Sequence, residues 1–263
     1  MNKLDYAIDL DGPLLDKVKT HFTQDIDFSH YPFSLNIIKT LPEIKFPTKV
    51  TFFVGENGTG KSTILEAIAL QAGFGPEGGS RNIHFKTSQE NTYTGTELLA
   101  QQLVLSWRKK PRDGYFFRAE SFFNIANYLD HMAKEGGEGP YKTYAPYGGK
   151  SLHAQSHGES FLAFFKNRVG NGGFFIFDEP EAALSPQRQL SLMVIIHEMC
   201  KRSNAQFIIA THSPLLLAYP AATIYSCDSD ALTTIPYAET KHYQITKQFL
   251  DNPDYYLHHL FKD

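Results

Sequence analysis

The chain has 263 residues, of which 42% are hydrophobic and 20% charged, and its net charge at pH 7 is −3. This length suits one large α/β domain or one domain with an inserted lobe, and the composition allows a sizeable core and excludes wholesale disorder. The charge balance gives no overall basic field of the kind that attracts nucleic acid, although a local basic patch is compatible with it.

The cysteine content and the N-terminus bear on the compartment. Cys200 and Cys227 have no metal-ligand spacing, and so few cysteines favour a reducing environment. The first residues are too acidic for a signal peptide, and no apolar run approaches the roughly 20 residues that cross a bilayer. We therefore expect a cytoplasmic protein without membrane insertion.

The first elements are short. Residues 1–48 contain four prolines between short extended pieces, a pattern typical of strands and turns. Residues 49–54 predict a buried strand because β-branched and aromatic residues form a short run. Residues 64–70 contain good helix formers and predict a helix, which the glycine-rich residues 73–80 should end.

Residues 55–63 lie between that strand and that helix and match the phosphate-binding loop Gly-x-x-x-x-Gly-Lys-[Ser/Thr]. The glycines let backbone N–H groups turn inward around a triphosphate, Lys61 can reach its β- and γ-phosphates, and the Ser62 hydroxyl can hold Mg²⁺. The helix N-terminus adds a dipole that favours an anion. The alternative is a glycine-rich turn that binds nothing. We predict that the nucleotide contacts Gly55, Glu56, Asn57, Gly58, Thr59, Gly60, Lys61, Ser62 and Thr63.

Residues 81–150 are the least patterned part of the chain. Residues 97–107 suit a helix or a strand, residues 113–120 suit a turn and a strand, and residues 122–132 suit a helix. Residues 135–150 are rich in glycine, as in surface loops. We predict one domain in which 1–80 and 151–240 form the nucleotide-binding core. Residues 81–150 would form an inserted lobe that reads a partner, and 241–263 a C-terminal helical tail.

After residue 151 the pattern alternates between helix and strand. Residues 173–178 predict a strand that is apolar on both faces, as in a parallel sheet covered by helices, and it ends in Asp178 and Glu179. Asp178 would lie beside the phosphate loop and hold Mg²⁺ directly or through water. Glu179 would act as general base on a water that attacks the γ-phosphate. The alternative is that the two acids stabilise the start of the next helix through its dipole.

His212 follows a second buried strand, predicted near residues 206–211. It would lie at the sheet edge where ligands bind in open parallel sheets, and it could donate to the γ-phosphate or orient the water. A lone histidine at a strand end is also commonly structural. Other histidines show no ligand spacing and are interpreted as surface or loop residues: His84, His153, His157, His258 and His259.

Two further segments precede predicted helices. Residues 156–160 form a Ser/Gly turn, which is either a second anion site at a helix N-terminus or an ordinary helix cap. In residues 182–186, Ser185 suits an N-cap with Pro186 at the first helical position. We expect residues 182–186 to make a subunit contact as well.

Together, these segments resemble the ATP-binding-cassette (ABC) ATPases. The family's order is a phosphate loop (55–63), a signature (156–160), an acid strand (174–179), a D-loop (182–186) and a switch histidine (His212). The resemblance covers about residues 50–214. It is closest to stand-alone ATPases similar to the heads of SMC-like and RecF-like DNA maintenance proteins and to ATPases of some phage-defence systems. It implies an α/β P-loop NTPase of ABC type: a mostly parallel sheet flanked by helices, an antiparallel N-terminal part and an inserted helical lobe.

The sequence departs from the family in two segments, and a third feature, the adenine-stacking residue, is left open. The transporter signature reads Leu-Ser-Gly-Gly-Gln; Ser156 and Gly158 match it, whereas His157 replaces the first glycine and Glu159 the glutamine. Arg118 occupies the expected glutamine-loop position, and Glu120 follows shortly after it. The residue that takes the role of the family's glutamine is therefore either Arg118 or Glu120. The candidates for an aromatic residue that stacks on adenine are Tyr31 and Phe33, and either could instead belong to the core.

The resemblance implies a Mg²⁺-dependent ATPase with Lys61, Glu179 and His212 as catalytic residues and Ser62 and Asp178 at the metal. It also implies a head-to-tail homodimer, in which each ATP lies between the phosphate loop of one subunit and Ser156, Gly158 and Glu159 of the other. Such a chain would be an ATP-driven dimerisation switch in a DNA-linked process such as repair or phage defence. Two alternatives remain, the nucleotide-binding subunit of a membrane transporter and an ATP-gated regulatory partner of a separate effector.

Overall fold

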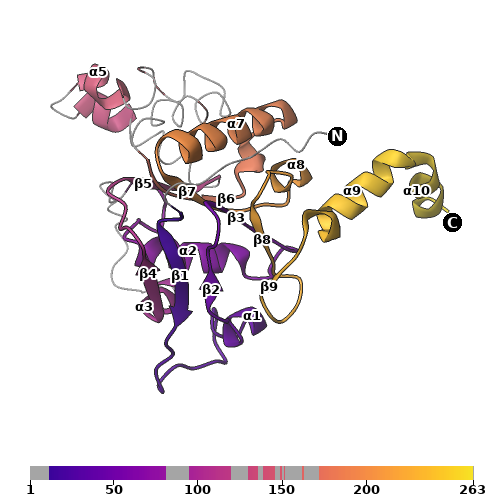
Figure 1. Cartoon of the computed structure of the whole chain (residues 1–263), viewed down its shortest axis with the longest axis horizontal. Helices are drawn as coiled ribbons and strands as arrows, with labels where there is room; N and C mark the ends of the chain where they lie inside the picture. The colour runs from indigo at the N-terminus through magenta and orange to yellow at the C-terminus, as the bar shows by residue number, and fades with distance from the viewer. Residues whose placement is uncertain are drawn as a thin grey trace.

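A computed structural model describes residues 12–80, 95–119, 130–135, 139–145, 149, 151, 162 and 172–262 (Figure 1). Within these residues the strands form two sheets, a six-stranded sheet in the order β5-β6-β7-β3-β8-β9 and a three-stranded sheet in the order β2-β1-β4. The strands of the larger sheet are β3 Val50–Val54, β5 Gly114–Arg118, β6 Gly173–Asp178, β7 Ala205–Ala210, β8 Thr223–Ser226 and β9 Thr233–Thr234. Those of the smaller sheet are β1 Leu15–Thr20, β2 Ile44–Lys45 and β4 Leu103–Trp107.

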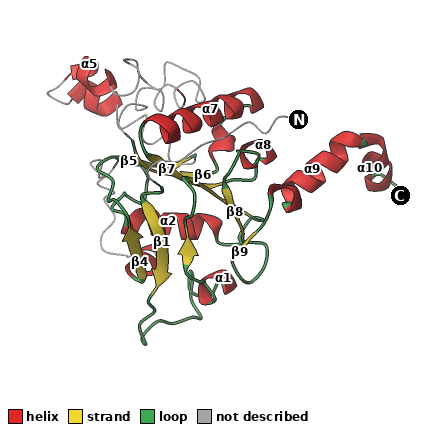
Figure 2. Cartoon of the chain, viewed as in Figure 1, coloured by secondary structure: helices red, strands yellow, loops and turns green. Residues whose placement is uncertain are grey.

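Helices cover both faces of the larger sheet, with α2 on one side and α7 and α8 on the other (Figures 1 and 2). The described helices are α1 Asn36–Lys39, α2 Lys61–Gln71, α3 Gly95–Gln101, α5 Gly139–Tyr144, α7 Pro186–Arg202, α8 Pro214–Leu217, α9 Lys241–Asp251 and α10 Pro253–Leu260. Two short 3₁₀ helices are η3 Pro180–Ala183 and η4 Tyr237–Glu239. This arrangement confirms the predicted mixed α/β class with a mostly parallel sheet.

The apolar strands supply two cores, one on each face of the larger sheet. In β6, Phe174 and Ile176 pack in the core shared with α2, whereas Phe175 and Phe177 pack in the core shared with α7 and α8. This alternation follows from the two-residue period of a strand, and it explains why β6 has no polar face. The smaller sheet packs against the opposite side of α2, so that α2 lies between the two sheets.

The two sheets are also joined by a buried glutamine on β7. The Gln206 side chain accepts a hydrogen bond from the Leu15 backbone N–H at 2.6 Å and donates one to the Leu15 carbonyl at 3.1 Å. Gln206 is fully buried. A polar side chain can occupy this position because both ends of its amide are paired.

The parallel pairing brings several strand ends to one edge of the larger sheet. β5, β6, β7 and β3 are in register at Arg118, Asp178, Ala210 and Phe53, because each pairs with the next in that order. The residues that follow β3, β6 and β7 therefore lie together at the carboxyl edge, where ligands bind in such sheets.

Most predicted element positions are confirmed, with corrections after residue 80. The predicted strand at 49–54 is β3, and the helix predicted at 64–70 is α2, which begins earlier, at Lys61. Residues 97–107 hold both a helix and a strand, α3 and β4. The predicted 81–150 lobe is too long, because β4 pairs with β1 and β5 with β6 in the two sheets. Of the helix predicted at 122–132, residues 122–129 lie outside the described residues.

The C-terminal tail forms two helices, as predicted, but they do not close the fold. Helices α9 and α10 form an arm that extends away from the rest of the molecule (Figure 1). Neither contains a buried residue, and several large apolar side chains of the arm are exposed: Ile245, Leu250, Tyr255, Leu257, Leu260 and Phe261. No helix in the described parts of the chain has the length and apolar character needed to cross a bilayer.

The buried amide of Gln206 leads to a prediction about the free energy of unfolding. Replacing Gln206 with leucine should lower the free energy of unfolding by about 2–4 kcal/mol, because buried Leu15 loses both its amide partners. Urea unfolding of the wild type and the variant would measure the difference.

Gln102 offers a matched control. Its side chain accepts a hydrogen bond from the Thr23 backbone N–H at an exposed position, so Gln102→Leu should cost less than about 0.5 kcal/mol. Equal effects of the two substitutions would contradict a special role of Gln206 in joining the sheets.

Candidate functional site

The loop between β3 and α2 has a backbone shape that depends on glycine. Gly58 and Gly60 have φ values of 78° and 94°, in the left-handed region that favours glycine. A Cβ atom on Gly60 would also lie 2.8 Å from Cγ2 of Ile37. Gly60 is the N-cap residue of α2 and makes no side-chain cap, so no side chain at that position covers the first N–H groups of the helix.

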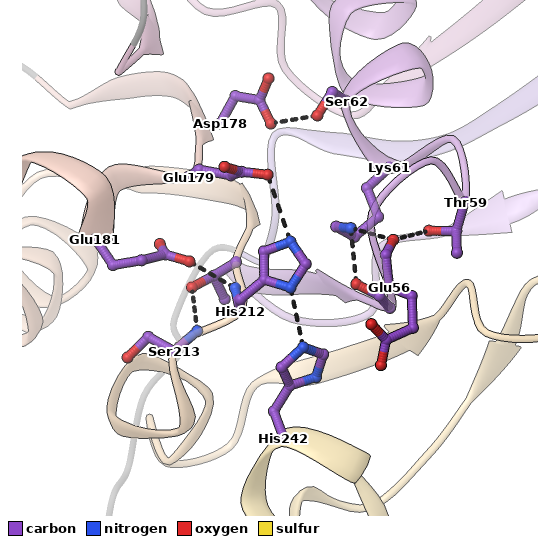
Figure 3. Close-up of polar contacts among 12 residues, drawn as sticks. Glu56, Thr59, Lys61, Ser62, Asp178, Glu179, Glu181, His212, Ser213 and His242 are labelled. Carbon is purple, nitrogen blue, oxygen red and sulfur yellow. Dashed lines mark hydrogen bonds and ion pairs between the residues drawn. The ribbon is translucent and has the colours of Figure 1, made fainter. Parts of the chain in front are cut away.

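Lys61 lies at the centre of this loop. Its side chain turns back over the loop, and Nζ donates to the carbonyls of Gly55 at 2.7 Å and Glu56 at 2.8 Å (Figure 3). The residue is only 4% exposed, and this burial lowers the pKa of Lys61. The two carbonyls hold the ammonium group between the loop and the acids at the end of β6.

A hydroxyl and a carboxylate meet beside the loop. Ser62 Oγ donates to Asp178 Oδ1 at 2.9 Å, which joins the start of α2 to the end of β6 (Figure 3). Oxygen ligands of this kind suit Mg²⁺, which binds one or two protein groups and completes its shell with water and phosphate oxygens. Within the described residues no group of three or more His, Cys, Asp or Glu side chains could hold a metal ion. One hydroxyl and one carboxylate oxygen fit a Mg²⁺ ion that shares its shell with a phosphate.

The positive charge of Arg118 lies beside two acids near this Ser62–Asp178 pair, Glu66 and Asp178 itself. Arg118 Nη1 lies 3.0 Å from Glu66 Oε2, and its Nε lies 3.8 Å from Asp178 Oδ2. Burial raises the pKa of Glu66, and the Arg118 guanidinium opposes that shift. Arg118 is the last residue of β5 and pairs in register with Asp178 of β6. The expected glutamine-loop position is thus occupied by an arginine that contacts both Glu66 and Asp178. Glu120 lies outside the described residues.

Glu179 has a strained backbone. Its φ and ψ are 50° and 53°, a left-handed conformation that is uncommon for a residue with a Cβ and costs of the order of 1–3 kcal/mol. Its backbone N–H donates to the Ala210 carbonyl at 3.0 Å, which ties this turn to β7. The side chain is 42% exposed and faces the phosphate loop across a pocket of about 400 Å³. Glu179 makes no side-chain capping bond to η3, so capping does not account for it.

His212 is held from two sides at the end of β7. Its backbone N–H donates to Glu181 Oε1 at 2.6 Å, and its Nδ1 lies 2.9 Å from Nε2 of His242 (Figure 3). His212 Nε2 lies 3.4 Å from Glu179 Oε1, and this buried nitrogen makes no hydrogen bond within the described residues. Burial lowers the pKa of His212, and the nearby Lys61 ammonium adds to the shift, so neutral imidazole is favoured.

The aromatic candidates for adenine stacking separate clearly. Phe33 is 4% exposed and packs edge-to-face against Phe22 and Phe28, so it belongs to the core, the alternative that the sequence left open for it. Tyr31 is 59% exposed, lines the pocket, and its hydroxyl lies 3.0 Å from Thr63 Oγ1. A second pocket of about 210 Å³ adjoins the first on the side of Asp228.

Other predicted positions have mixed outcomes. Ser156, Gly158 and Glu159, together with the rest of the signature, lie outside the described residues. Ser185 is the N-cap residue of α7 with Pro186 at its first position, as predicted, although the serine side chain makes no capping bond. Asn57 and Gly58 are exposed at the rim of the loop. Sequence reasoning missed His242, because nothing in the helical tail marks it as a neighbour of His212.

Glu181 yields a prediction about pH. Burial raises the pKa of Glu181 above its ordinary value of 4.5, and its Oε2 is buried without a hydrogen bond within the described residues. The folded state therefore binds this proton more tightly than the unfolded state, so wild-type stability falls as the pH rises through the raised pKa. Glu181→Gln keeps the size and the acceptor for His212 N–H but cannot ionise. We expect the variant to gain stability relative to wild type as the pH rises from about 4 to about 8.

Urea unfolding at both pH values would measure this difference. Glu239→Gln, at an exposed position, is the matched control and should track the wild type at both. The difference in the free energy of unfolding between Glu181→Gln and wild type could instead stay constant across this pH range. That result would show that ionisation of Glu181 does not destabilise the folded state.

Comparison with known proteins gave two family models and several solved structures. Residues 32–128 match the model described as "AAA domain", and residues 160–218 match the model described as "AAA domain, putative AbiEii toxin, Type IV TA system". No curated protein matches the sequence.

Two of the solved structures that match, both distant in sequence, are an SMC head domain and part of an ABC transporter complex. The SMC head domain from Thermotoga maritima is 16% identical, with 85% of this chain and 98% of that chain covered and a TM-score of 0.44. CbiO1 from Clostridium perfringens, part of the ABC transporter complex CbiONQ, is 16% identical, with 83% and 89% covered and a TM-score of 0.41. The phosphate loop between β3 and α2, the mostly parallel sheet and the two family matches together support a P-loop NTPase fold with similarity to AAA domains.

Proposed function

We propose that the chain binds ATP with Mg²⁺ in the pocket between the phosphate loop and Glu179 and hydrolyses it to ADP and phosphate. The observation that supports this most directly is the convergence of three pairs of groups at one sheet edge. These are Lys61 with its loop, Ser62 with Asp178, and Glu179 with His212. The AAA-type family models and the fold point to ATP binding and hydrolysis in general, and the residue roles are our proposal.

In this proposal each residue has a distinct task. The loop N–H groups and Lys61 bind the β- and γ-phosphates, for which Lys61 exchanges its carbonyl partners for phosphate oxygens. Ser62 and Asp178 would hold Mg²⁺, which neutralises charge on the phosphates. Glu179 accepts a proton from the attacking water. As this happens, the oxygen of the water bonds to the γ-phosphorus, and the bond between the γ-phosphorus and the oxygen that bridges it to the β-phosphate breaks. His212 directs its Nε2 proton towards the γ-phosphate.

We further propose that ATP joins two copies of the chain head to tail, in the cytoplasm. In such a dimer Ser156, Gly158 and Glu159 of a second copy complete the shell around the γ-phosphate. The half-exposed side chain of Glu179 supports this, since a base that must exclude bulk water needs a further surface over it. ATP then favours the closed pair and hydrolysis favours release, a two-state switch biased by the contacts of one phosphate.

A role in a DNA-linked process is the finer part of the proposal. Three exposed basic side chains, Lys109, Lys110 and Arg112, border a hollow of about 360 Å³ beside the start of β6, at the edge of the sheet opposite to the ATP pocket. A cluster of this kind suits a phosphate backbone, even on a chain of net charge −3. The family model over residues 160–218 names a toxin–antitoxin system, which favours defence over repair.

The roles of Glu179 and Lys61 predict different defects. Glu179→Gln should lower kcat for ATP by about a hundredfold or more, because the amide cannot accept the water proton, while ATP still binds. The variant should accumulate as an ATP-bound dimer in size-exclusion chromatography with light scattering. Lys61→Ala should instead lose ATP binding, as measured by fluorescence titration with a labelled nucleotide.

Glu239→Gln, at an exposed position, serves as control and should match the wild type in turnover. A Glu179→Gln protein that remains monomeric with ATP and turns over at the wild-type rate would refute both the proposed base and the proposed switch.

The basic cluster predicts a salt-dependent effect. Wild type should bind duplex DNA at low salt, and joint replacement of Lys109, Lys110 and Arg112 by alanine should weaken binding about tenfold or more and flatten its salt dependence. Replacement of Lys39, Lys45 and Lys262 by alanine removes the same charge elsewhere on the exposed surface and should weaken DNA binding less. Fluorescence anisotropy at several salt concentrations would measure both.

Absence of DNA and RNA binding at low salt, with no effect of either on ATP turnover, would reject the DNA-linked role. In that case co-purification with a polytopic membrane protein would support a transporter subunit. Co-purification with a separate nuclease or toxin would support an ATP-gated effector.

A further inference from the structure

The imidazole pair His212–His242 joins the candidate site to a part of the chain outside every motif. His242 lies in the first turn of α9, and its Nε2 is 2.9 Å from Nδ1 of His212. The two rings lie at 60° with centroids 5.0 Å apart (Figure 3). One of the two nitrogens must donate and the other accept, so the pair fixes a proton position.

Two separate observations give the same direction for this hydrogen bond. On the first ring, the buried Nε2 of His212 also makes no hydrogen bond within the described residues, but the Glu179 carboxylate lies 3.4 Å from it. This negative charge favours a proton on Nε2 and leaves Nδ1 as acceptor. On the second ring, Nδ1 of His242 is buried without a hydrogen bond within the described residues. A buried N–H without an acceptor is less acceptable than a buried lone pair, so the proton of His242 belongs on Nε2. His242 therefore donates to His212.

The first turn of α9 and the residues just before it are tied to the phosphate loop through Asp228 and to the start of α8. Lys241 Nζ lies 3.8 Å from Asp228, whose carboxylate accepts from the backbone N–H of Glu56 in the phosphate loop at 2.9 Å. Buried Thr240 caps the helix by accepting from the Tyr243 N–H at 3.4 Å. Just before it, the hydroxyl of Tyr237 donates to the Pro214 carbonyl at 3.0 Å, at the start of α8.

We infer that His242 is a positioning residue for His212, so that the C-terminal arm forms a working part of the ATP site. Its Nε2–H holds Nδ1 of His212 as acceptor, which keeps the His212 proton on Nε2, directed at the pocket. The tautomer of a functional histidine is set in this way by the partner of its other nitrogen. This inference rests on the proposed function, since it assigns His242 a task in the same hydrolysis.

The surroundings of the pair favour neutral rings. Burial lowers the pKa of His242, with Lys61 and Lys241 acting in the same direction and Glu56 and Asp228 opposing it. The same pattern holds at His212, where burial comes first, Lys61 and His242 add to it, and Glu179 opposes it. At least one of the two rings must be neutral, because two protonated rings would bring two N–H groups face to face.

Substitution of His242 tests the inference through ATP kinetics on the full chain. His242→Leu should lower kcat about tenfold, the size typical for the loss of such an outer hydrogen bond, and leave KM for ATP within about twofold. His242→Gln should recover most of the activity, because its side-chain nitrogen is the same number of bonds from Cβ as Nε2 of histidine and can donate to His212. His258→Leu, which removes an exposed histidine from the same arm, should match the wild type.

The outcomes separate the inference from the proposed function. A wild-type chain without ATPase activity would refute the proposed function, and the inference with it. Active wild type with an equally active His242→Leu variant would refute the inference alone. So would a loss in His242→Leu that His242→Gln does not recover, or one that appears only in KM.

A second measurement does not depend on turnover. In ¹⁵N-labelled wild type, the imidazole nitrogens of His212, assigned with a His212→Gln variant, should show the Nε2–H tautomer. In His242→Leu the same resonances should shift towards a mixture of tautomers. An Nδ1–H tautomer of His212 in the wild type would overturn the inference, even if the leucine variant proved too unstable for kinetics.

Discussion

The common carboxyl edge of four parallel strands is the constraint on which the site depends. Arg118, Asp178 and Ala210 are in register across β5, β6 and β7, and Ala210 pairs with Phe53 of β3. The phosphate loop, the acids and the histidine come from distant stretches of chain and meet only through this pairing. A shift of β6 by one residue would move Asp178 by about 3.3 Å along the strand, enough to break its 2.9 Å hydrogen bond from Ser62. The two apolar cores that hold the strands in register therefore also fix the relative positions of the phosphate loop, the acids and the histidine.

The charges at that edge are balanced by burial and by pairing. Lys61 is buried beside Asp178 and Glu179, and Arg118 lies between Glu66 and Asp178. Buried charges are costly unless they have partners, so each cation here stabilises a neighbouring acid. Among these charged side chains Glu179 is the most exposed, at 42%, and its backbone is held in a strained conformation by a hydrogen bond to β7. Strain of this kind is retained where the side chain must face in one direction, which here is across the pocket towards the loop.

The sequence predicted most of the larger sheet and the loop, because those signals are local. Apolar runs give strands, and the glycine spacing before Lys61 gives the loop. The same reasoning placed Asp178, Glu179 and His212 at one edge, since parallel strands share their carboxyl ends. It misplaced the boundary of the inserted lobe, because the pairing of β4 with β1 is a long-range contact that no local pattern records. It also kept Phe33 as a stacking candidate, since an aromatic residue in a loop has the same sequence signal whether it packs inward or outward.

The histidine pair shows why a tail with no buried residue can still matter to the site. Helices α9 and α10 gain almost nothing from apolar burial, so contacts in the first turn of α9 and just before it hold the arm in its orientation. Those contacts are with His212, with Asp228 beside the phosphate loop and with the start of α8. If His242 supports His212 as we infer, a change that rotates His212 also alters a contact that holds the arm. Coupling of this kind acts equally in both directions, because it is one interaction free energy shared by two sites.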